Sequence, residues 1–353
     1  MSEIKANLEL KSANGICSIY IQDGILDQAG EIVTRHIRGR NAVVVADSKT
    51  FPLFAERIRR SFERAGFSVA FSVFEAGELS KTPATYLKML SDFSAADLTR
   101  SGVVVALGGG VVGDVAGFAA ATFLRGVPVV QIPTTLLAQV DSSIGGKTGI
   151  DMPFGKNSVG AFHQPTAVIT DPQVLKTLTP RVFADGMAEV IKYGCIRDAE
   201  LFNGLLKGDF NLEETILKCA KIKVDVVQAD EFDRGERMLL NFGHTVGHAI
   251  EKVLNFSGLT HGEAVGIGMM VAAKVGARLG ETDVTAQIEA ALLAHNLPVS
   301  SDLDVGLICK ALGADKKRDA ARINYVVLAD IGEGILREIS IEELSRLVKE
   351  VWK

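Results

Sequence analysis

The sequence predicts an α/β domain with a parallel sheet, followed by a second, mainly helical domain. Three observations support this. Short β-branched runs alternate with helical patterns in the first half, one such run enters a glycine-rich turn before a helix, and helical spacing dominates after about Asp171. We place the boundary in a proline-bounded segment near residues 172–182, which gives domains of 1–178 and 179–353. The length of 353 residues fits two domains of roughly 150 residues each.

The first half alternates expected strands with expected helices, which places the strands parallel in one sheet. A sheet covered on both faces needs strands that are apolar throughout, and the run Val103–Leu107 has this character. The expected strands are Ala42–Ala46, Ser68–Phe74, Val103–Leu107, Val129–Ile132 and Ala167–Thr170. The expected helices are Pro52–Ala65, Pro83–Ser94 and Asp114–Thr122.

The second half carries the spacing of apolar residues that is typical of helices. Asn211 and Thr260 stand before two of the expected helices, where a side-chain oxygen can cap the first turn. Ile323–Leu328 and Ile335–Ile339 are expected to form a late hairpin around Asp330 and Gly332. The expected helical segments are 180–205, 211–232, 238–255, 261–279, 283–295 and 341–352.

The composition is that of a globular protein rich enough in apolar residues to bury a core. Apolar residues make up 47% and charged residues 23%, which excludes disordered, collagenous and fibrous classes. A net charge of −5 argues against a broad nucleic-acid surface, because phosphate neutralisation needs concentrated positive charge. We therefore expect no nucleic-acid partner.

The N-terminus, the hydropathy and the cysteines together favour a protein of the reducing cytoplasm. The first ten residues, MSEIKANLEL, hold no apolar run, so we expect no secretory signal. The stretch from Gly102 to Leu124 is long enough for a membrane span, but it contains three consecutive glycines and Asp114, and Arg125 closes it. A buried strand followed by a buried helix explains it better, and we expect no membrane span. The cysteines, which lack metal-site spacing, are Cys17, Cys195, Cys219 and Cys309.

A glycine-rich turn, Gly108–Gly113, matches the dinucleotide-binding pattern G-x-G-x-x-G between a strand and a helix. Glycines allow a pyrophosphate to approach the backbone, and the N–H groups at the helix start face its charge. The fingerprint is incomplete, because the next strand, Val129–Pro133, ends without the expected acidic residue. A tight turn without a ligand is therefore the alternative to nucleotide binding.

A second glycine-rich segment, Ser143–Thr148, ends like a P-loop but has Asp141 where that motif needs its first glycine. An ATPase function is therefore weakly supported. Lys147 and Lys156 in this apolar, glycine-rich region are nevertheless suited to binding an anion. Their alternative role is that of solvated surface lysines.

Three of the six histidines lie close together in the sequence, and they suggest a metal site. His244 and His248 share one helix face, whereas His261 stands at the start of the next expected helix. The glutamate of the H-E-x-x-H motif is missing, so a metalloprotease is not supported. Glu189 is a candidate third ligand, because it lies in an apolar helix where an unpaired carboxylate is costly to bury. Lys192 falls on the same face, so a Glu189–Lys192 ion pair with hydrogen-bonded core histidines is the alternative. Spacing does not decide which two histidines would bind the metal.

Taken together, these residues resemble the 3-dehydroquinate synthase family. The matches occur in order between Glu78 and the Lys316–Lys317 pair. The matching segments are Gly108–Gly117, Pro133–Thr135, Asp141–Thr148, Gly155–Asn157, Gly186–Gly194, Asn241–Glu251 and His261–Met269.

The resemblance implies a Rossmann-like NAD-binding domain followed by a helical domain that binds metal and substrate. The implied enzyme is a carbon–oxygen lyase that converts 3-deoxy-D-arabino-heptulosonate 7-phosphate (DAHP) to 3-dehydroquinate and phosphate in the shikimate pathway of aromatic amino acid biosynthesis. Its steps are transient oxidation by NAD, phosphate elimination, re-reduction and intramolecular aldol closure. The implied cofactors are NAD and a divalent metal, zinc or cobalt, and the implied assembly is a cytoplasmic homodimer.

The resemblance also implies roles for individual residues. The metal ligands fall on Glu189, His244 and His261, which leaves His248 on the substrate side. Arg125 matches an arginine that reaches the neighbouring subunit's phosphate pocket. The implied NAD contacts are Ala76, Gly77, Glu78, Leu79, Ser80, Lys81, Gly110, Val111, Val112, Gly113, Asp114, Thr134, Thr135, Lys147, Lys156, Val174, Leu175, Lys176 and Thr177. The implied substrate contacts are Asp141, Lys147, Asn157, Lys192, Lys223, Arg237, Asn241, His248 and, of the last lysine pair, Lys316.

Three other functions share some of these features. A related sugar-phosphate cyclase such as a valiolone or inosose synthase would use the same cofactors, and a substrate panel separates it. A metal-dependent polyol dehydrogenase would release NADH stoichiometrically. A catalytically inactive nucleotide-binding or scaffold protein would have lost part of the charged pocket, whereas this sequence fills the positions described above.

Overall fold

The computed structural model of the chain describes residues 4–13, 15–255, 257–314 and 322–352. The chain forms two compact units. The first comprises Met1–Leu178 and Cys219–Phe232, and the second comprises Thr179–Lys218 and Asp233–Lys353. The helix α7 (Leu212–Ala229) therefore begins in the second unit and ends in the first.

The first unit is built on a seven-stranded sheet with the order β1-β2-β9-β6-β5-β3-β4. Only the β1–β2 pair is antiparallel, and the other neighbours are parallel. All five expected strands are confirmed in the parallel part. The strands are β1 (Leu8–Ser12), β2 (Gly15–Ile21), β3 (Asn41–Asp47), β4 (Ser68–Phe74), β5 (Val103–Gly108), β6 (Val129–Pro133) and β9 (Ala167–Thr170).

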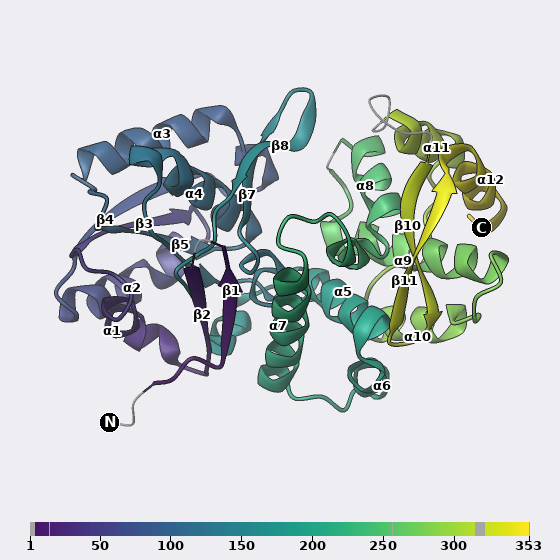
Figure 1. Cartoon of the computed structure of the whole chain (residues 1–353), viewed down its shortest axis with the longest axis horizontal. Helices are drawn as coiled ribbons and strands as arrows, with labels where there is room; N and C mark the ends of the chain where they lie inside the picture. The colour runs from purple at the N-terminus through teal and green to yellow at the C-terminus, as the bar shows by residue number, and fades with distance from the viewer. Residues whose placement is uncertain (1–3, 14, 256, 315–321, 353) are drawn as a thin grey trace. The chain divides into compact units, whose positions relative to one another are not determined.

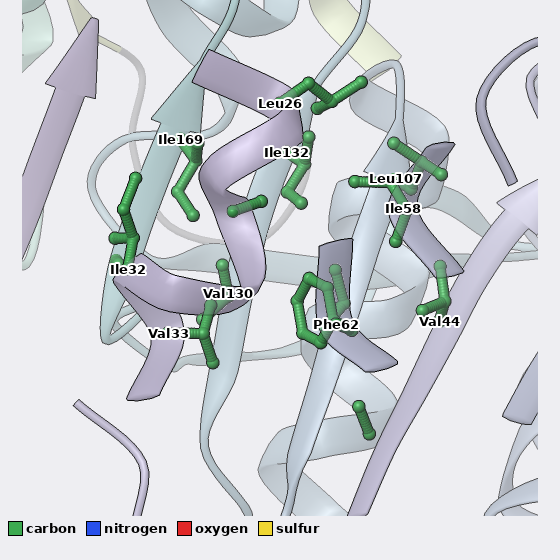
Figure 2. Close-up of a cluster of buried hydrophobic side chains, with 14 of the residues drawn as sticks. Leu26, Ile32, Val33, Val44, Ile58, Phe62, Leu107, Val130, Ile132 and Ile169 are labelled. Atoms are coloured by element: carbon green, nitrogen blue, oxygen red, sulfur yellow. The ribbon is translucent and has the colours of Figure 1, made fainter. Parts of the chain in front are cut away.

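Helices cover both faces of this sheet. Successive residues of a strand point to opposite faces, so each strand contributes side chains to both layers of packing. On one face, Val44 of β3 and Val130 of β6 pack with Ile58 and Phe62 of α2 (Phe51–Arg64) in the cluster that Figure 2 shows. The short helix α1 (Ala29–Thr34) belongs to the same layer. On the other face, Val43 and Val104 pack with α3 (Pro83–Ala95) and α4 (Gly110–Thr122).

The segment Gly102–Leu124 is the buried strand and helix that the sequence predicts. Its glycines leave the strand β5 at Gly108 and enter α4 at Gly110, four residues before the expected start. A hairpin of β7 (Lys147–Met152) and β8 (Gly155–Phe162) packs against α4 (Figure 1). The sequence did not predict this hairpin. Among the described residues, no helix combines the length and apolarity needed to span a bilayer.

The strand order contains a topological switch point between β3 and β5. β4 and β5 both adjoin β3, on opposite sides, so the chain reverses its direction of travel across the sheet between them. In parallel α/β sheets, ligands bind at such a switch point, outside the carboxyl ends of the strands.

The second unit is mainly helical, as the sequence predicts, and it also contains the expected late hairpin, β10 (Arg322–Asp330) with β11 (Glu333–Ser340). Thr260 caps its helix as expected, and Asn211 accepts a hydrogen bond from the Glu214 N–H at 3.1 Å. The helix α11 was not expected. The helices are α5 (Pro180–Arg197), α6 (Ala199–Lys207), α8 (His244–Val253), α9 (His261–Arg278), α10 (Thr285–Ala294), α11 (Val305–Ala314) and α12 (Ile341–Val351).

Candidate functional site

Three side chains from three helices of the second unit meet in one place. Glu189 lies in the middle of α5, His244 is the first residue of α8 and His261 is the first residue of α9. The Glu189 Oε1 atom lies 3.3 Å from His244 Nε2 and 3.5 Å from His261 Nε2. The structure therefore brings together the carboxylate and two of the histidines that the sequence singled out.

This arrangement fits a metal ion. The Oε1 atom of Glu189 is buried without a hydrogen-bond partner among the described residues, which is costly for a carboxylate oxygen. Bonds of about 2.0–2.1 Å to a tetrahedral zinc ion would place neighbouring ligand atoms about 3.3–3.4 Å apart. The observed separations match that edge length. One carboxylate oxygen and two imidazole nitrogens are also a common donor set for catalytic zinc.

The second oxygen of Glu189 has a different partner, because Lys192 donates to Oε2 from one turn later in α5. Both side chains are buried, with 0% and 1% of their surface exposed. The ion pair and the metal set that the sequence offered as alternatives thus coexist, with one carboxylate oxygen for each.

Charges in this cluster perturb the pKa values of its members. Burial raises the pKa of Glu189, but Lys192 and His244 outweigh burial and hold that pKa well below its usual range. Burial lowers the pKa of His261, but the neighbouring carboxylates of Glu189 and Glu251 outweigh it and raise this pKa to about 10. The carboxylate at the centre is therefore ionised at neutral pH, as a metal ligand must be.

The other ring nitrogens of the two histidines are also engaged. The Nδ1 atom of His244 lies 3.1 Å from the carbonyl oxygen of Phe242, and the Nδ1 atom of His261 lies 3.4 Å from Glu251 Oε1. Glu251 was not predicted as a site residue. The available signal was its position on the histidine-bearing helix, three residues after His248.

Local sequence explains how the two histidines are placed. Gly243 precedes His244 in a left-handed conformation with φ of 79°, and a Cβ atom there would lie 2.6 Å from Met269 Cγ. At the other helix, Thr260 and Glu263 form a capping box around the first turn. Asp185, one turn before Glu189 on α5, accepts a hydrogen bond from the N–H of Gly262 at 2.5 Å. This bond ties the start of α9 to the helix that carries the carboxylate.

His248 lies at the outer side of this cluster. Its side chain is 57% exposed, and its Nε2 atom lies 3.9 Å from Glu251 Oε2. His248, Glu251 and His261 form a second group whose ligand atoms all lie within 4.8 Å of one another. His261 belongs to both groups.

The remaining predicted residues of this unit lie in η6 (Glu236–Asn241) or outside the described residues. The Arg237 side chain is buried, and Asn241 is exposed two residues before Gly243. Lys316 and Lys317 lie outside the described residues.

In the first unit, the predicted cofactor residues follow the carboxyl ends of four parallel strands. These ends meet at one edge of the sheet, which is where dinucleotides bind in α/β folds. The segments are 76–81 after β4, 110–114 after β5, 134–135 after β6 and 174–177 after β9. The Nε2 group of Gln139 donates to the carbonyl oxygens of Pro133 at 3.2 Å and Asp171 at 3.0 Å, which holds the last two turns together.

The glycine-rich turn is a tightly packed connection between β5 and α4, and its geometry also suits an anionic ligand. Cβ atoms would lie 2.4 Å from Val112 Cγ2 at Gly108 and 2.8 Å from Gln131 Oε1 at Gly113, so any larger residue there would force these side chains to shift. No side chain caps the first turn of α4, whose N-cap is Gly109. The N–H groups of that turn therefore lack a side-chain acceptor, which suits an anionic ligand.

Two ion pairs connect the predicted cofactor segments of this unit. Lys81 Nζ lies 2.5 Å from Asp114 Oδ2, and Lys156 Nζ lies 2.9 Å from Glu78 Oε1. Burial raises the pKa of Asp114, and Lys81 counteracts part of that increase. The side chain of Leu79, in the same turn as Glu78, is 87% exposed.

The predicted substrate residues of the first unit lie in several places. Asp141 and Lys223 form an ion pair between η4 (Ala138–Ser142) and α7. Lys147 begins strand β7, and Asn157 lies in β8 with a φ of 52°. Arg125 is exposed with a φ of 67°, a conformation that is uncommon outside glycine.

Known proteins agree with this reading of the fold. The sequence pattern of the 3-dehydroquinate synthase N-terminal region matches residues 71–185, and that of the C-terminal region matches residues 186–318. A 3-dehydroquinate synthase from Clostridium acetobutylicum is 42% identical over 353 residues, covering 98% of this chain and 99% of the relative. One from Clostridium beijerinckii is 44% identical over 336 residues, covering 93% and 96%.

A solved structure with the same fold is the 2-epi-5-epi-valiolone synthase from Streptomyces hygroscopicus subsp. jinggangensis, with NAD⁺ and Zn²⁺ bound. It superimposes with a TM-score of 0.85 at 25% identity, covering 99% of both chains. The molecule thus has the fold of the dehydroquinate synthase-like cyclases. Within that class, the chain belongs to the 3-dehydroquinate synthase family.

Proposed function

We propose that this chain converts DAHP to 3-dehydroquinate and phosphate, using NAD catalytically and a divalent metal ion. The family matches, which continue through both units, support this activity over that of the valiolone synthase, to which identity is 25% rather than 42%. The observation that carries the chemistry is the buried Oε1 atom of Glu189, which has no hydrogen-bond partner among the described residues and faces two imidazole nitrogens at 3.3 and 3.5 Å.

In this proposal, Glu189, His244 and His261 hold the metal ion. A divalent ion at these ligands supplies Lewis acidity, which lowers the pKa of a bound hydroxyl and polarises a ketone. Glu189 binds through Oε1, because Lys192 occupies Oε2. Lys192 thereby keeps the carboxylate in a fixed orientation and places a positive charge beside the ligand set.

The nicotinamide cofactor supplies a reversible hydride acceptor, and the first unit binds it at the carboxyl edge of the sheet. The uncapped first turn of α4 receives the pyrophosphate, with Gly110–Asp114 as its backbone. Lys81 and Lys156, each paired with a carboxylate, keep the two flanking turns in place. Thr134, Thr135 and the segment Val174–Thr177 complete this edge.

Cationic side chains bind the carboxylate and the phosphate of the substrate. Arg237 suits bidentate contact with an anion, whereas lysines act as point charges. Asp141 orients Lys223 through their ion pair. Positioning one flexible substrate for successive steps is a large part of the catalytic task. The cationic set is Lys147, Lys192, Lys223, Arg237 and Lys316, with Asn157 as a neutral contact.

His248 and Asn241 handle protons and hydroxyl groups. The His248 imidazole is exposed beside the ligand set, so it can reach a bound substrate and exchange protons with solvent. Asn241 is exposed immediately before the turn that carries His244, and its amide can orient a substrate hydroxyl.

We further propose that the chain acts as a cytoplasmic homodimer. The four cysteines are free in the structure, and the sequence favours a reducing compartment. Arg125, exposed in a left-handed conformation between α4 and β6, reaches the phosphate pocket of the neighbouring subunit. Equilibrium sedimentation of the wild type tests the dimer, and phosphate release by an Arg125→Ala variant tests the role of that arginine.

The decisive experiment measures phosphate release from DAHP while absorbance at the NADH band is followed, with and without a chelator. We expect phosphate release that stops in chelator and resumes on adding zinc, without net accumulation of NADH. His261→Ala should lose bound zinc and reduce phosphate release by a factor on the order of 10³ or more. His295→Gln, a change at a histidine of the same unit that hydrogen-bonds to Leu205, is the matched control.

Three results would contradict the proposal. Normal activity of metal-free protein would exclude the metal role, and stoichiometric NADH production would indicate a dehydrogenase. Turnover of another sugar phosphate in preference to DAHP would assign the chain to a related cyclase.

A further inference from the structure

Glu251 occupies an unusual position for an acidic side chain near the end of a helix. It belongs to α8, and its side chain is only 7% exposed. Its Oε1 atom lies 3.4 Å from His261 Nδ1 on the neighbouring helix α9. Burying a carboxylate costs free energy unless polar groups compensate it. The contact with His261 is one such compensating interaction.

The imidazole of His261 lies between two buried carboxylates. One ring edge, with Nε2, faces Glu189 Oε1 at 3.5 Å, and the other, with Nδ1, faces Glu251 Oε1 at 3.4 Å. A neutral imidazole carries one proton, and the nitrogen that holds it cannot bind a metal ion. Whichever group accepts that proton therefore decides which nitrogen is available for coordination.

We propose that Glu251 is a positioning residue for His261: it accepts the Nδ1 proton, fixes the ring orientation and directs the Nε2 lone pair toward the cation. This inference rests on the proposed metal site. Carboxylates that accept the second N–H of a ligating histidine make the ring a stronger donor, and losing such a partner typically costs 10–100-fold in metal affinity.

The other histidine of the set provides an internal comparison. His244 uses Nδ1 in the same way, but its acceptor is the neutral carbonyl oxygen of Phe242 at 3.1 Å. Both rings thus turn Nε2 toward Glu189 and Nδ1 toward an acceptor. Only the acceptor of His261 is a side chain, so only that anchor can be removed by substitution.

The alternative role of Glu251 is that of a ligand. Together with His248 and His261 it forms a group that can also hold an ion. Substitution of Glu251 by glutamine distinguishes its role as a hydrogen-bond acceptor from a role as a metal ligand. Glutamine retains an oxygen that accepts the Nδ1 proton, but it is a poor substitute for an ionised carboxylate ligand.

The experiment measures the zinc dissociation constant of the full chain by competition with a chromogenic chelator. Glu251→Leu, which removes the acceptor, should weaken binding about 10–100-fold. Glu251→Gln should stay within several-fold of the wild type. Glu281→Gln, which removes a mostly buried carboxylate paired with Arg337 in the same unit, is the matched control and should leave the constant unchanged. Thermal denaturation followed by circular dichroism checks that each variant is folded.

A spectroscopic signature accompanies the affinities. In zinc-loaded protein labelled with ¹⁵N-histidine, the Nδ1 proton of His261 should be resolved and slow to exchange, because it is hydrogen-bonded. Glu251→Gln should shift this resonance and Glu251→Leu should abolish it, while the Nδ1 proton of His244 remains. If the leucine variant does not fold, the glutamine variant decides: an unchanged resonance would overturn the proposal.

The outcomes separate this inference from the proposed function. Wild-type zinc affinity in Glu251→Leu, combined with loss of binding in Glu189→Gln, would overturn the role of Glu251 and leave the metal site intact. Equal loss in the glutamine and leucine variants would make Glu251 a ligand and overturn its positioning role. Unimpaired zinc binding by Glu189→Gln would contradict the proposed metal site itself.

Discussion

The ion pairs at the predicted sites of the two units differ in burial. In the first unit, the Lys156–Glu78 pair is 25% and 30% exposed, and Asp114, the partner of the buried Lys81, is 22% exposed. In the second unit, the Lys192–Glu189 pair is buried at 1% and 0%. The first unit is suited to binding an anionic ligand largely through backbone groups at strand ends, and the second to holding a cation with buried charge.

This difference indicates in which unit a change at a site residue lowers the free energy of unfolding most. Exposed ion pairs contribute little to stability, because solvent already satisfies their members. A buried pair is different, since removing one partner leaves a desolvated charge with no compensation. We therefore expect the helical unit to be the more sensitive of the two to changes at its site residues.

The largest expected effect is that of Glu189→Gln. The substitution preserves size but leaves the Lys192 ammonium group buried beside a neutral amide, which should cost about 3–5 kcal/mol of stability in metal-free protein. The measurement is urea denaturation at pH 7 followed by circular dichroism. Glu281→Gln serves as the control for removing a carboxylate from the same unit. A loss below about 1 kcal/mol would show that the burial of this pair does not have the energetic weight we assign to it.

The next effect concerns glycines at close contacts. A Cβ atom at Gly268 of α9 would lie 1.9 Å from the carbonyl oxygen of Gly243, and backbone cannot yield as a side chain can. We expect Gly268→Ala to destabilise the second unit by about 1–3 kcal/mol through overpacking, and to weaken zinc binding because Gly243 precedes His244.

The matched substitution in the first unit is Gly117→Ala in α4. There the new methyl group meets Thr148 Cγ2 at 2.4 Å, a side-chain atom that can rotate away. Alanine also improves helix propensity by about 0.5–1 kcal/mol. We expect a net loss below about 1 kcal/mol in the same denaturation experiment. A larger loss for Gly117→Ala than for Gly268→Ala would reverse the comparison between the units.

A smaller effect is expected for Asp141→Asn. The Asp141–Lys223 pair of the first unit is intermediate in burial, at 18% and 9%, so removing one charge should cost about 1 kcal/mol of stability. Because Lys223 then loses its orientation, the KM for DAHP should rise more than kcat falls. Glu78→Gln, at a more exposed pair, should change stability by less than about 0.5 kcal/mol. If Asp141→Asn lowered the free energy of unfolding as much as Glu189→Gln does, burial could not explain the difference between the ion pairs of the two units.

The fold could be predicted where one physical signal dominates. Continuous apolar runs such as Val103–Leu107 form parallel strands because both faces of that sheet are covered. The start of α4 at Gly110 was predicted four residues late, because glycines give no helix signal although their packing requires them there. Helix α11 and the β7–β8 hairpin were missed. The first is short and has few polar residues to mark one face, and the second depends on packing against α4.

The site could be predicted as a set of residue types but not as a geometry. Spacing alone offers three histidines and does not decide which two of them would bind a metal ion. The family resemblance implies Glu189, His244 and His261, and the structure places these two histidines, from separate helices, beside the same oxygen of Glu189. Glu251 was not predicted: its position three residues after His248 is a weak signal, and its contact with His261 depends on how the neighbouring helix packs.

The smallest expected effect compares one half-buried histidine in each unit. Burial lowers the pKa of His36, and Arg35 adds to this. Burial also lowers the pKa of His295, while the hydrogen bond to Leu205 opposes it. A histidine with a lowered pKa in the folded state binds its proton more readily when unfolded, so stability is lost as the pH falls below about 6.5. Both effects should be modest.

The measurement is the titration of both histidines by NMR, together with urea denaturation between pH 7 and pH 5. Both pKa values should lie below 6.5, the ordinary value for histidine. His295→Gln should flatten the pH dependence of stability in the second unit only, and His36→Gln in the first only. These residues lie outside the proposed metal and cofactor sets, so any change in zinc affinity in either variant would mean that the pH response of the unit is coupled to its site. A pKa at or above 6.5 for either histidine would show that its burial is compensated by a partner, and the contrast between the units would then rest on the ion pairs and glycines alone.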